Sequence, residues 1–449
     1  MKKLLLILLI LLGLIGLIAR TYQFGQVPVS LYWDEVAVGL DARSLLQTGL
    51  DLNQHSLLQP IFISYGDYKA PVFIWLVTLL GKFISVTELS IRLPSLLSFI
   101  GTAWFLFQII KELSPKKSLT PAFVLVSLLI MPWSFHFSRI GMESHISLFW
   151  LVLSVYLMIK KKPIFSSLAV ILGIYTYVSL RFLAPALFVI TFLLYSWKKF
   201  KSFGLGLILI ALSLLILIKS PYYSASQQYR LSNDNLIIST QRKPVKLKNF
   251  IFNYSSYFDP QFLLVSGDPN LRHHSGFGGE LLLVQGILLI AGLVALLNLK
   301  RRETILIFSW LFLSPVVAAL VNETPHASRA IYMLVPLAWL IGLGWSRFKK
   351  LFALILGLLL IINLSVYLHD YFVHYPSRSA QAWILPYKQA ALQFKASLPT
   401  QPVYISDQYY KPELYFAFYL NDLSLFHSNP KYIYQLPAVC PQEAICLKY

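Results

Sequence analysis

The feature that most constrains this chain is a series of apolar runs, most of them near 20 residues long, that recur along nearly its whole length. A helix of about 20 apolar residues spans the roughly 30 Å of hydrocarbon in a bilayer. Hydrophobic residues make up 57% of the chain and charged residues only 13%, which leaves little polar surface for a water-soluble domain. The sequence therefore predicts an all-α polytopic membrane protein.

The first run, MKKLLLILLILLGLIGLIAR (1–20), begins like a signal peptide but has no small-residue cleavage site before Arg20. We interpret it as an uncleaved first membrane helix. The hydrophobic spans that follow predict ten more, for about eleven in all, at 92–110, 119–135, 146–160, 164–180, 182–197, 202–219, 281–297, 304–320, 329–345 and 351–367.

The net charge of +19 comes mostly from short basic clusters between the apolar runs, such as KELSPKK (111–117), KKFK (198–201) and RFKK (347–350). Such clusters mark cytoplasmic loops, so a nucleic-acid partner is not expected. All of these clusters lie on the cytoplasmic side if APVFIWLVTLLGKFIS (70–85) lies in the membrane interface and does not cross the membrane. This choice predicts a plasma-membrane protein with a cytoplasmic N-terminus, a first outer loop (20–91) and a long outer loop (220–280).

After a membrane domain spanning 1–367, residues 368–449 are predicted to form a small extracytoplasmic α/β domain. QPVYISD (401–407) has a strand pattern, and QAWILPYKQAALQFKAS (381–397) has that of an amphipathic helix. The two cysteines of the chain, Cys440 and Cys446, both lie in this domain. An outer compartment allows a disulfide there, but the short loop between them could strain it, so the pairing stays open.

Most of the unusual polar residues are expected on the outer side or at the outer ends of helices. Two adjacent acids, Asp34 and Glu35, follow the first helix almost at once in SLYWDEVAVGLDARSLLQTG (30–49). Other candidates are Lys69, Arg139, Glu143, Tyr175, Arg181, Asp268, Arg272, His273, His274, His326 and Arg329. Acids among bases suit a reaction on an anionic lipid, because Arg and Lys hold phosphate while a carboxylate accepts a proton from an attacking hydroxyl.

Structural alternatives exist for several of these residues. An arginine at a helix end often serves as an interfacial anchor, which is the favoured interpretation of Arg92. Asp268, His273 and His274 could contribute to a zinc site, but no third and fourth ligand is evident nearby, so no metal site is predicted. A divalent ion is compatible with the sequence and is not required.

Several blocks in order resemble the GT-C membrane glycosyltransferases that use polyprenyl-phosphate sugars. These include protein O-mannosyltransferases, lipid A aminoarabinose transferases and their RgtA/B/C/D-like bacterial relatives. The blocks are YWDEVAVGLDARSLLQTG, YKAPVFIWLVTLLGKFISVTELSIRLPS, HFSRIGMES, YTYVSLRFLAP, SYFDPQFLLVSGDPNLRHHSGFGG and PHASRAIYMLVPLAWLIGLG. They cover about residues 1–370, and KAP stands where the family more usually has Lys-Pro-Pro.

The resemblance implies a GT-C fold with juxtamembrane helices in the first outer loop. It maps Asp34 onto the proposed catalytic base and Lys69 onto a lysine that contacts lipid phosphate. The partners expected are the bilayer, a polyprenyl-phosphate sugar donor and a lipid, glycan or protein acceptor.

Combining the resemblance with the residues, we predict an inverting transferase. Asp34 and Glu35 are the candidate catalytic acids, and Glu35 could instead orient the bases or position the acceptor. The candidate phosphate ligands are Lys69, Arg139, Arg181 and Arg329. The candidate substrate contacts are Glu143, Tyr175, Asp268, Arg272, His273, His274 and His326. The alternative is a transporter or flippase of lipid-linked sugars, which would bind the same phosphate without catalysis.

Overall fold

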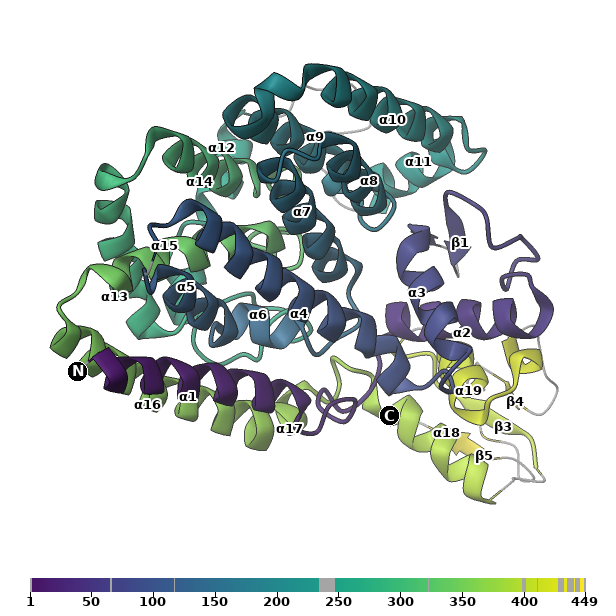
Figure 1. Ribbon diagram of the computed structural model, residues 1–449. Coiled ribbons are helices and arrows are strands. Elements are labelled where there is room, and N and C mark those ends of the chain that lie inside the picture. The colour runs from purple at the N-terminus through teal and green to yellow at the C-terminus, as the bar shows by residue number, and fades with distance from the viewer. Residues whose placement is uncertain are drawn as a thin grey trace.

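A computed structural model of the chain describes residues 2–64, 67–116, 118–233, 247–321, 323–397, 401–409, 411–426, 432–433, 440 and 445–447. It is mainly helical, with the N-terminal helix and the last long apolar helix lying side by side along one edge (Figure 1).

Every predicted membrane segment except 119–135 corresponds to one helix or to a helix with a short extension. The helices of the predicted segments are α1 (Lys2–Thr21), α4 (Glu88–Leu113), α5 (Thr120–Leu129), α7 (Glu143–Ile159), α8 (Pro163–Ile174), α9 (Leu180–Thr191), α10 (Phe200–Lys219), α13 (Leu283–Ala295), α14 (Arg301–Leu313), α15 (Leu334–Arg347) and α16 (Lys350–His369). Five helical stretches of the described residues are long and apolar enough to cross a membrane, and the others are shorter apolar helices. The chain is a multi-pass membrane protein.

The predicted helix at 119–135 is in fact two helices. α5 ends at Leu129, and the six-residue α6 (Pro132–Phe137) follows after a break. Met131 is extended, with φ −72° and ψ 124°. The proline ring of Pro132 disfavours helical geometry in the residue before it, which accounts for the break. Between α10 and α13 the structure describes α11 (Tyr223–Asn233), α12 (Leu247–Ser256) and the short π-helix η3 (Gln261–Val265).

The first outer loop folds into α2 (Trp33–Thr48), the antiparallel strands β1 (Phe62–Ser64) and β2 (Asp67–Lys69), and α3 (Pro71–Gly81). At a rise of about 1.5 Å per residue, the 11 residues of α3 extend roughly 16 Å, about half of the hydrocarbon thickness. It is one of several apolar helices of 10 to 12 residues, together with α5, α8 and α9.

Two fully buried arginines hold the connection between α1 and α2. Arg139 donates to four backbone carbonyls, those of Ala19, Arg20, Gln23 and Val27. Arg92 donates to three more, those of Gly25, Pro28 and Ser30. Carbonyl groups beyond a helix end lack helical partners, and a guanidinium with five N–H donors satisfies several at once. This pair of arginines thereby fixes where α2 begins.

The C-terminal segment is α/β, as its sequence pattern predicts. After α17 (Tyr375–Ser379) and α18 (Leu385–Ser397) come the strand β3 (Val403–Ile405) and the helix α19 (Pro412–Leu420). Parallel pairing with β4 (Tyr432–Ile433) and β5 (Ile445–Leu447) makes a small sheet in the order β4-β3-β5.

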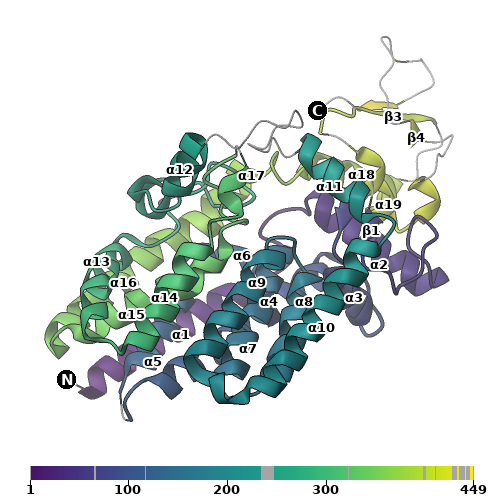
Figure 2. The ribbon, with the colours of Figure 1, turned by 90° about the horizontal axis from the view of Figure 1, so that it is seen from above.

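These C-terminal elements pack on the first outer loop, so segments far apart in the sequence lie side by side (Figure 2). α19 lies against α2 so closely that a Cβ at Gly39 would stand 2.7 Å from the ring of Phe418. The hydroxyl of Tyr415 donates to the carbonyl of Leu31, and Lys388 donates to the carbonyl of Val29. The start of α2 is therefore supported from both sides, by the buried arginines and by the C-terminal segment.

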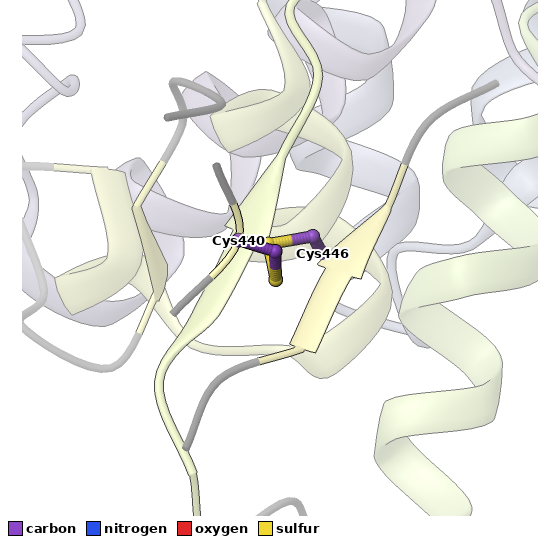
Figure 3. Close-up of a disulfide and its surroundings, with 2 residues drawn as sticks. All are labelled: Cys440 and Cys446. Carbon is purple, nitrogen blue, oxygen red and sulfur yellow. A yellow bond between two sulfur atoms is a disulfide. The ribbon is translucent and has the colours of Figure 1, made fainter. Parts of the chain in front are cut away.

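The two cysteines form a disulfide beside the small sheet (Figure 3). Cys446 lies in β5 opposite Tyr404 of β3, and Cys440 precedes it by six residues. The two cysteines are therefore paired with each other, which the sequence alone did not decide.

Candidate active site

A cavity of about 180 Å³ lies where the predicted first outer loop meets the ends of several helices. Its polar lining residues come from α2, β2, α7, the α8–α9 connection, α9, α11 and two later loops: Asp34, Asp67, Tyr68, Lys69, Glu143, Thr176, Tyr177, Arg181, Ser226, Arg272, His273, His326, Ser328 and Arg329. Pockets for drug-sized ligands run from about 300 to 1,000 Å³. The cavity therefore fits a small polar group, such as a sugar phosphate, rather than a lipid chain.

Eight of the thirteen predicted site residues line this cavity, although they are far apart in the sequence. They are Asp34, Lys69, Glu143, Arg181, Arg272, His273, His326 and Arg329. Glu35, Arg139, Tyr175, Asp268 and His274 are not among its lining residues.

Lys69, at the end of β2, is the buried cation of the site. Its ammonium group forms an ion pair with Asp34 and a second with Asp67 at 2.9 Å. Burial alone lowers the pKa of Lys69, but the charges of Asp34, Asp67 and Glu143 outweigh it and hold that pKa well above its usual range. Lys69 is therefore a permanent positive charge inside the cavity.

Asp34 and Glu35 are adjacent in the first turn of α2 and point in different directions, because successive helical residues are rotated by about 100°. The side chain of Asp34 is 36% exposed and reaches the cavity. That of Glu35 is 1% exposed and accepts hydrogen bonds from Arg92 (3.1 Å), the amide of Gly141 (2.7 Å) and the amide of Tyr32 (3.0 Å). Glu35 thus fastens α2 to its neighbours, and its position does not support a direct catalytic role.

Three arginines join Lys69 around the cavity: Arg181 of α9, and Arg272 and Arg329 of later loops. The guanidinium of Arg272 lies 3.7 Å from the ring centroid of Tyr32, which fixes it by a cation–π contact. Arg329 lies 3.8 Å from the carboxylate of Glu323. Together these cations outnumber the lining carboxylates by one, which suits an anionic ligand.

Asp268, His273 and His326 form a buried cluster at the cavity edge. Asp268 accepts from the amides of Ala327 (2.7 Å) and Asn270 (2.8 Å), and its second oxygen lies 3.2 Å from Nδ1 of His273. Burial alone raises the pKa of Asp268, but these hydrogen bonds outweigh it and lower that pKa. Burial, together with nearby His273 and Arg329, lowers the pKa of His326 well below its usual range, so its ring is neutral.

The same three residues offer one possible metal-ligand set. One ligand atom from each lies within 4.8 Å of the others. The sequence analysis named Asp268 and His273 and paired them with His274, whereas the structure brings His326 to them. His274 turns away instead: it accepts from the amide of Gly276, and its Nε2 lies 3.3 Å from the carbonyl of Gly279. Burial lowers the pKa of His274 to about 4.

The structure places the other predicted residues in supporting positions. Tyr175 donates to the carbonyl of Ser213 in α10 at 2.8 Å, so its hydroxyl joins two helices. Arg139 uses its two terminal nitrogens on the backbone between α1 and α2 and does not line the cavity, so its position does not support the predicted role as a phosphate ligand. In both cases the polar atoms are engaged by backbone carbonyls outside the cavity.

Sequence analysis missed Asp67, which shares Lys69 with Asp34. A signal was present in GDYKAP, because residues two apart in a strand point to the same face. Tyr177, Thr176, Ser226 and Ser328 were also missed. They are ordinary polar residues whose sequence context does not distinguish them from others.

A buried acid, Asp41, joins the helix that carries Asp34 to the strand pair that carries Lys69. Ser64 of β1 donates to Asp41 at 2.6 Å, and the amide of Leu52 donates at 3.4 Å. Burial, with a smaller contribution from nearby Asp51, raises the pKa of Asp41 from 3.8 to about 7. A raised carboxyl pKa means that the folded state binds this proton more tightly than the unfolded state does.

The stability contributed by the protonated form of Asp41 should therefore fall as the pH rises from about 4 to about 7. Asp41→Asn removes the ionisation and keeps an acceptor for Ser64. We expect it to stabilise the protein at pH 8, by up to about 4 kcal/mol, and to have a smaller effect at pH 5. Thermal unfolding of detergent-solubilised protein across this range measures the effect, with the exposed Asp407→Asn as control. Equal pH dependence in wild type and Asp41→Asn would contradict it.

Comparisons with known proteins identify the fold to which this chain belongs. No protein-family model matches the chain, and no curated protein matches it. ArnT from Cupriavidus metallidurans, solved bound to undecaprenyl phosphate, superposes with a TM-score of 0.57 at 13% identity, covering 92% of this chain and 84% of ArnT.

The oligosaccharyltransferase AglB from Archaeoglobus fulgidus, in complex with an inhibitory peptide and a dolichol-phosphate, gives a TM-score of 0.51 at 14% identity. The match covers 97% of this chain and 64% of AglB. A structure of the same enzyme in complex with Zn and sulfate gives 0.54 at 14% identity, covering 92% and 61%. The chain thus has the GT-C fold of these membrane proteins.

Proposed function

We propose that the chain is an integral membrane glycosyltransferase that moves a sugar from a polyprenyl-phosphate donor to an acceptor hydroxyl at the outer face of the membrane. The observation that carries the proposal is the single cavity in which Asp34, Lys69 and three arginines meet. Structures of the same fold bind undecaprenyl phosphate or a dolichol-phosphate, which supports a lipid-phosphate donor.

In the proposed reaction, the acceptor hydroxyl gives its proton to Asp34 as its oxygen attacks the anomeric carbon. The bond between that carbon and the phosphate oxygen breaks, and the electron pair leaves with the lipid phosphate. A single displacement of this kind inverts the anomeric configuration. The phosphate changes from a singly charged diester to a more highly charged monoester, so one negative charge develops on the leaving group.

That developing charge is where the cations act. Lys69, Arg181, Arg272 and Arg329 line the cavity into which the phosphate would fit. Fixed charges aimed at a developing anion stabilise the transition state without reorganisation, and this term is usually the largest one in catalysis. Asp67 has a supporting role in the proposal, because it holds Lys69 when Asp34 has taken up a proton.

A divalent ion is compatible with the proposal but carries no step of it. Asp268, His273 and His326 are donors of the type that bind zinc. The oxygens of Asp268 already accept two amide hydrogen bonds and contact His273, so binding would require this arrangement to open. If an ion is bound there, it would add positive charge beside Arg272 and Arg329.

The first test is donor cleavage by the purified protein. Incubation with a panel of undecaprenyl-phosphate sugars labelled in the sugar should release undecaprenyl phosphate when acceptor-containing cell-envelope extract is added. A nucleotide sugar serves as the control donor and should stay intact, and parallel reactions with EDTA measure any dependence on metal. Movement of intact labelled donor across a liposome membrane, without cleavage, would instead indicate a transporter.

The proposed orientation places the N-terminus in the cytoplasm and residues 368–449 outside. The disulfide supports it, because disulfides persist in oxidising compartments. Ser114, after α4, and the exposed Ser397, at the end of α18, provide single-cysteine reporters on the two sides. An impermeant maleimide added to intact cells should label Ser397→Cys and spare Ser114→Cys until the cells are opened. The reverse pattern would overturn the orientation.

A further inference from the structure

A second cavity lies at the opposite end of the helices from the candidate active site. It has a volume of about 760 Å³ and lies open between the N-terminal end of α1, the start of α5 and the turn between α15 and α16. Figure 1 shows the N-terminal end of α1 beside these elements. Three lysines line it, Lys2, Lys349 and Lys350, together with the hydroxyl residues Ser118, Thr120 and Ser346.

The lysines of this cavity differ from two others in basic clusters on the same side of the membrane, Lys160 and Lys300. Lys160 forms an ion pair with Glu112 at 2.6 Å, and Lys300 lies 3.8 Å from Glu303. The residues that line the cavity include no carboxylate. Three positive charges thus border one open pocket, and its described lining residues include no acid to balance them.

Exposed apolar side chains lie at and next to the lining residues Lys2, Lys350 and Leu351 in the sequence. Leu4, Leu351 and Phe352 have exposed fractions of 54%, 55% and 58%, on the helices α1 and α16 that pack against each other. In a bilayer these side chains contact acyl chains. A ligand with its charged end among the lysines would therefore lay its hydrocarbon along the two helices.

We propose that this cavity is a binding site for the phosphate head group of an anionic phospholipid, which joins the N-terminal end of α1 to the turn before α16. Basic pockets between membrane helices on the cytoplasmic side are suited to anionic head groups. The volume falls within the usual range for ligand sites of about 300 to 1,000 Å³. The site is separate from the catalytic cavity and does not depend on the proposed reaction.

The test measures phosphatidylglycerol binding to the purified full-length protein by native mass spectrometry and by thermal unfolding in detergent. Phosphatidylcholine and inorganic phosphate are the comparison ligands. Phosphatidylglycerol should raise the melting temperature and stay bound, whereas the other two should have little effect. An equal shift from inorganic phosphate would overturn the lipid assignment, and an equal shift from phosphatidylcholine would overturn the role of charge.

Two variants locate the site. Lys2→Gln with Lys349→Gln and Lys350→Gln removes the charges and should weaken phosphatidylglycerol binding by roughly tenfold or more. Ser346→Phe keeps all three charges and fills the cavity, and it should also reduce binding. The matched control, Lys198→Gln with Lys199→Gln and Lys201→Gln, removes the same charge from an exposed cluster outside the cavity. If the control loses as much binding as the first variant, the cavity is not the site.

Discussion

Asp34→Asn is expected to lower turnover by roughly 10²-fold or more, the scale of general-base catalysis, while the protein folds and still binds its donor. The amide keeps the size of the side chain and one acceptor oxygen but cannot take the proton of the acceptor hydroxyl. Asp34 is the candidate base because it lines the cavity and is partly exposed. The measurement is the rate of lipid-phosphate release, with donor binding determined separately.

Glu35, the residue next to Asp34, provides the matched control. Glu35→Gln removes a buried charge that pairs with Arg92, so we expect lower thermal stability from this variant. Its turnover per folded molecule should fall less than that of Asp34→Asn, because Glu35 does not reach the cavity. A turnover for Asp34→Asn within a few-fold of wild type, or a larger loss in folded Glu35→Gln, would show that the base is wrongly assigned.

Lys69→Ala is expected to weaken donor binding by about 1.5–3 kcal/mol, the range for a charge-assisted hydrogen bond. This corresponds to roughly a tenfold to 150-fold rise in the dissociation constant. The variant also leaves Asp34 and Asp67 without their shared cation, so two carboxylates would face the incoming phosphate. Lys69→Arg should recover part of the affinity. Binding of a labelled undecaprenyl-phosphate sugar to detergent-solubilised protein measures the effect.

Asp67→Asn tests whether Lys69 binds the donor phosphate or only positions Asp34. It removes the second carboxylate beside Lys69 and leaves the ion pair between Lys69 and Asp34 intact. Donor affinity should therefore be retained or rise, because Asp67 competes with phosphate for the same ammonium group. If Lys69→Ala binds donor as tightly as wild type, Lys69 serves only to position Asp34.

The fold could be predicted well because the signal for a membrane helix is compositional. Eleven apolar segments became helices near the expected bounds, and the main departure was the break at Met131, before Pro132. The proline was visible in the sequence. The proline alone does not predict a helix break, because neighbouring helices can support a proline inside a membrane helix.

The candidate site was less predictable because its members are distinguished by long-range contacts. Arg139 and Arg181 look alike in sequence, each beside a polar or aromatic run. Arg139 donates to backbone carbonyls more than a hundred residues away, whereas Arg181 lines the cavity. Asp34 and Glu35 are adjacent acids, and only the packing of α2 against Arg92 separates them. Hydropathy and residue type carry no information about such pairings.

The way α2 is held in place has a consequence for biogenesis. The segment before α2 leaves the ribosome early, yet Arg92 and Arg139, which bind its carbonyls, are made much later. Lys388 and Tyr415, which bind Val29 and Leu31, come close to the end of the chain. The segment between α1 and α2 therefore lacks these partners until synthesis is nearly complete. Catalytic competence would be acquired only at that point, so a nascent chain already inserted in the membrane would not yet act on lipid-linked sugars.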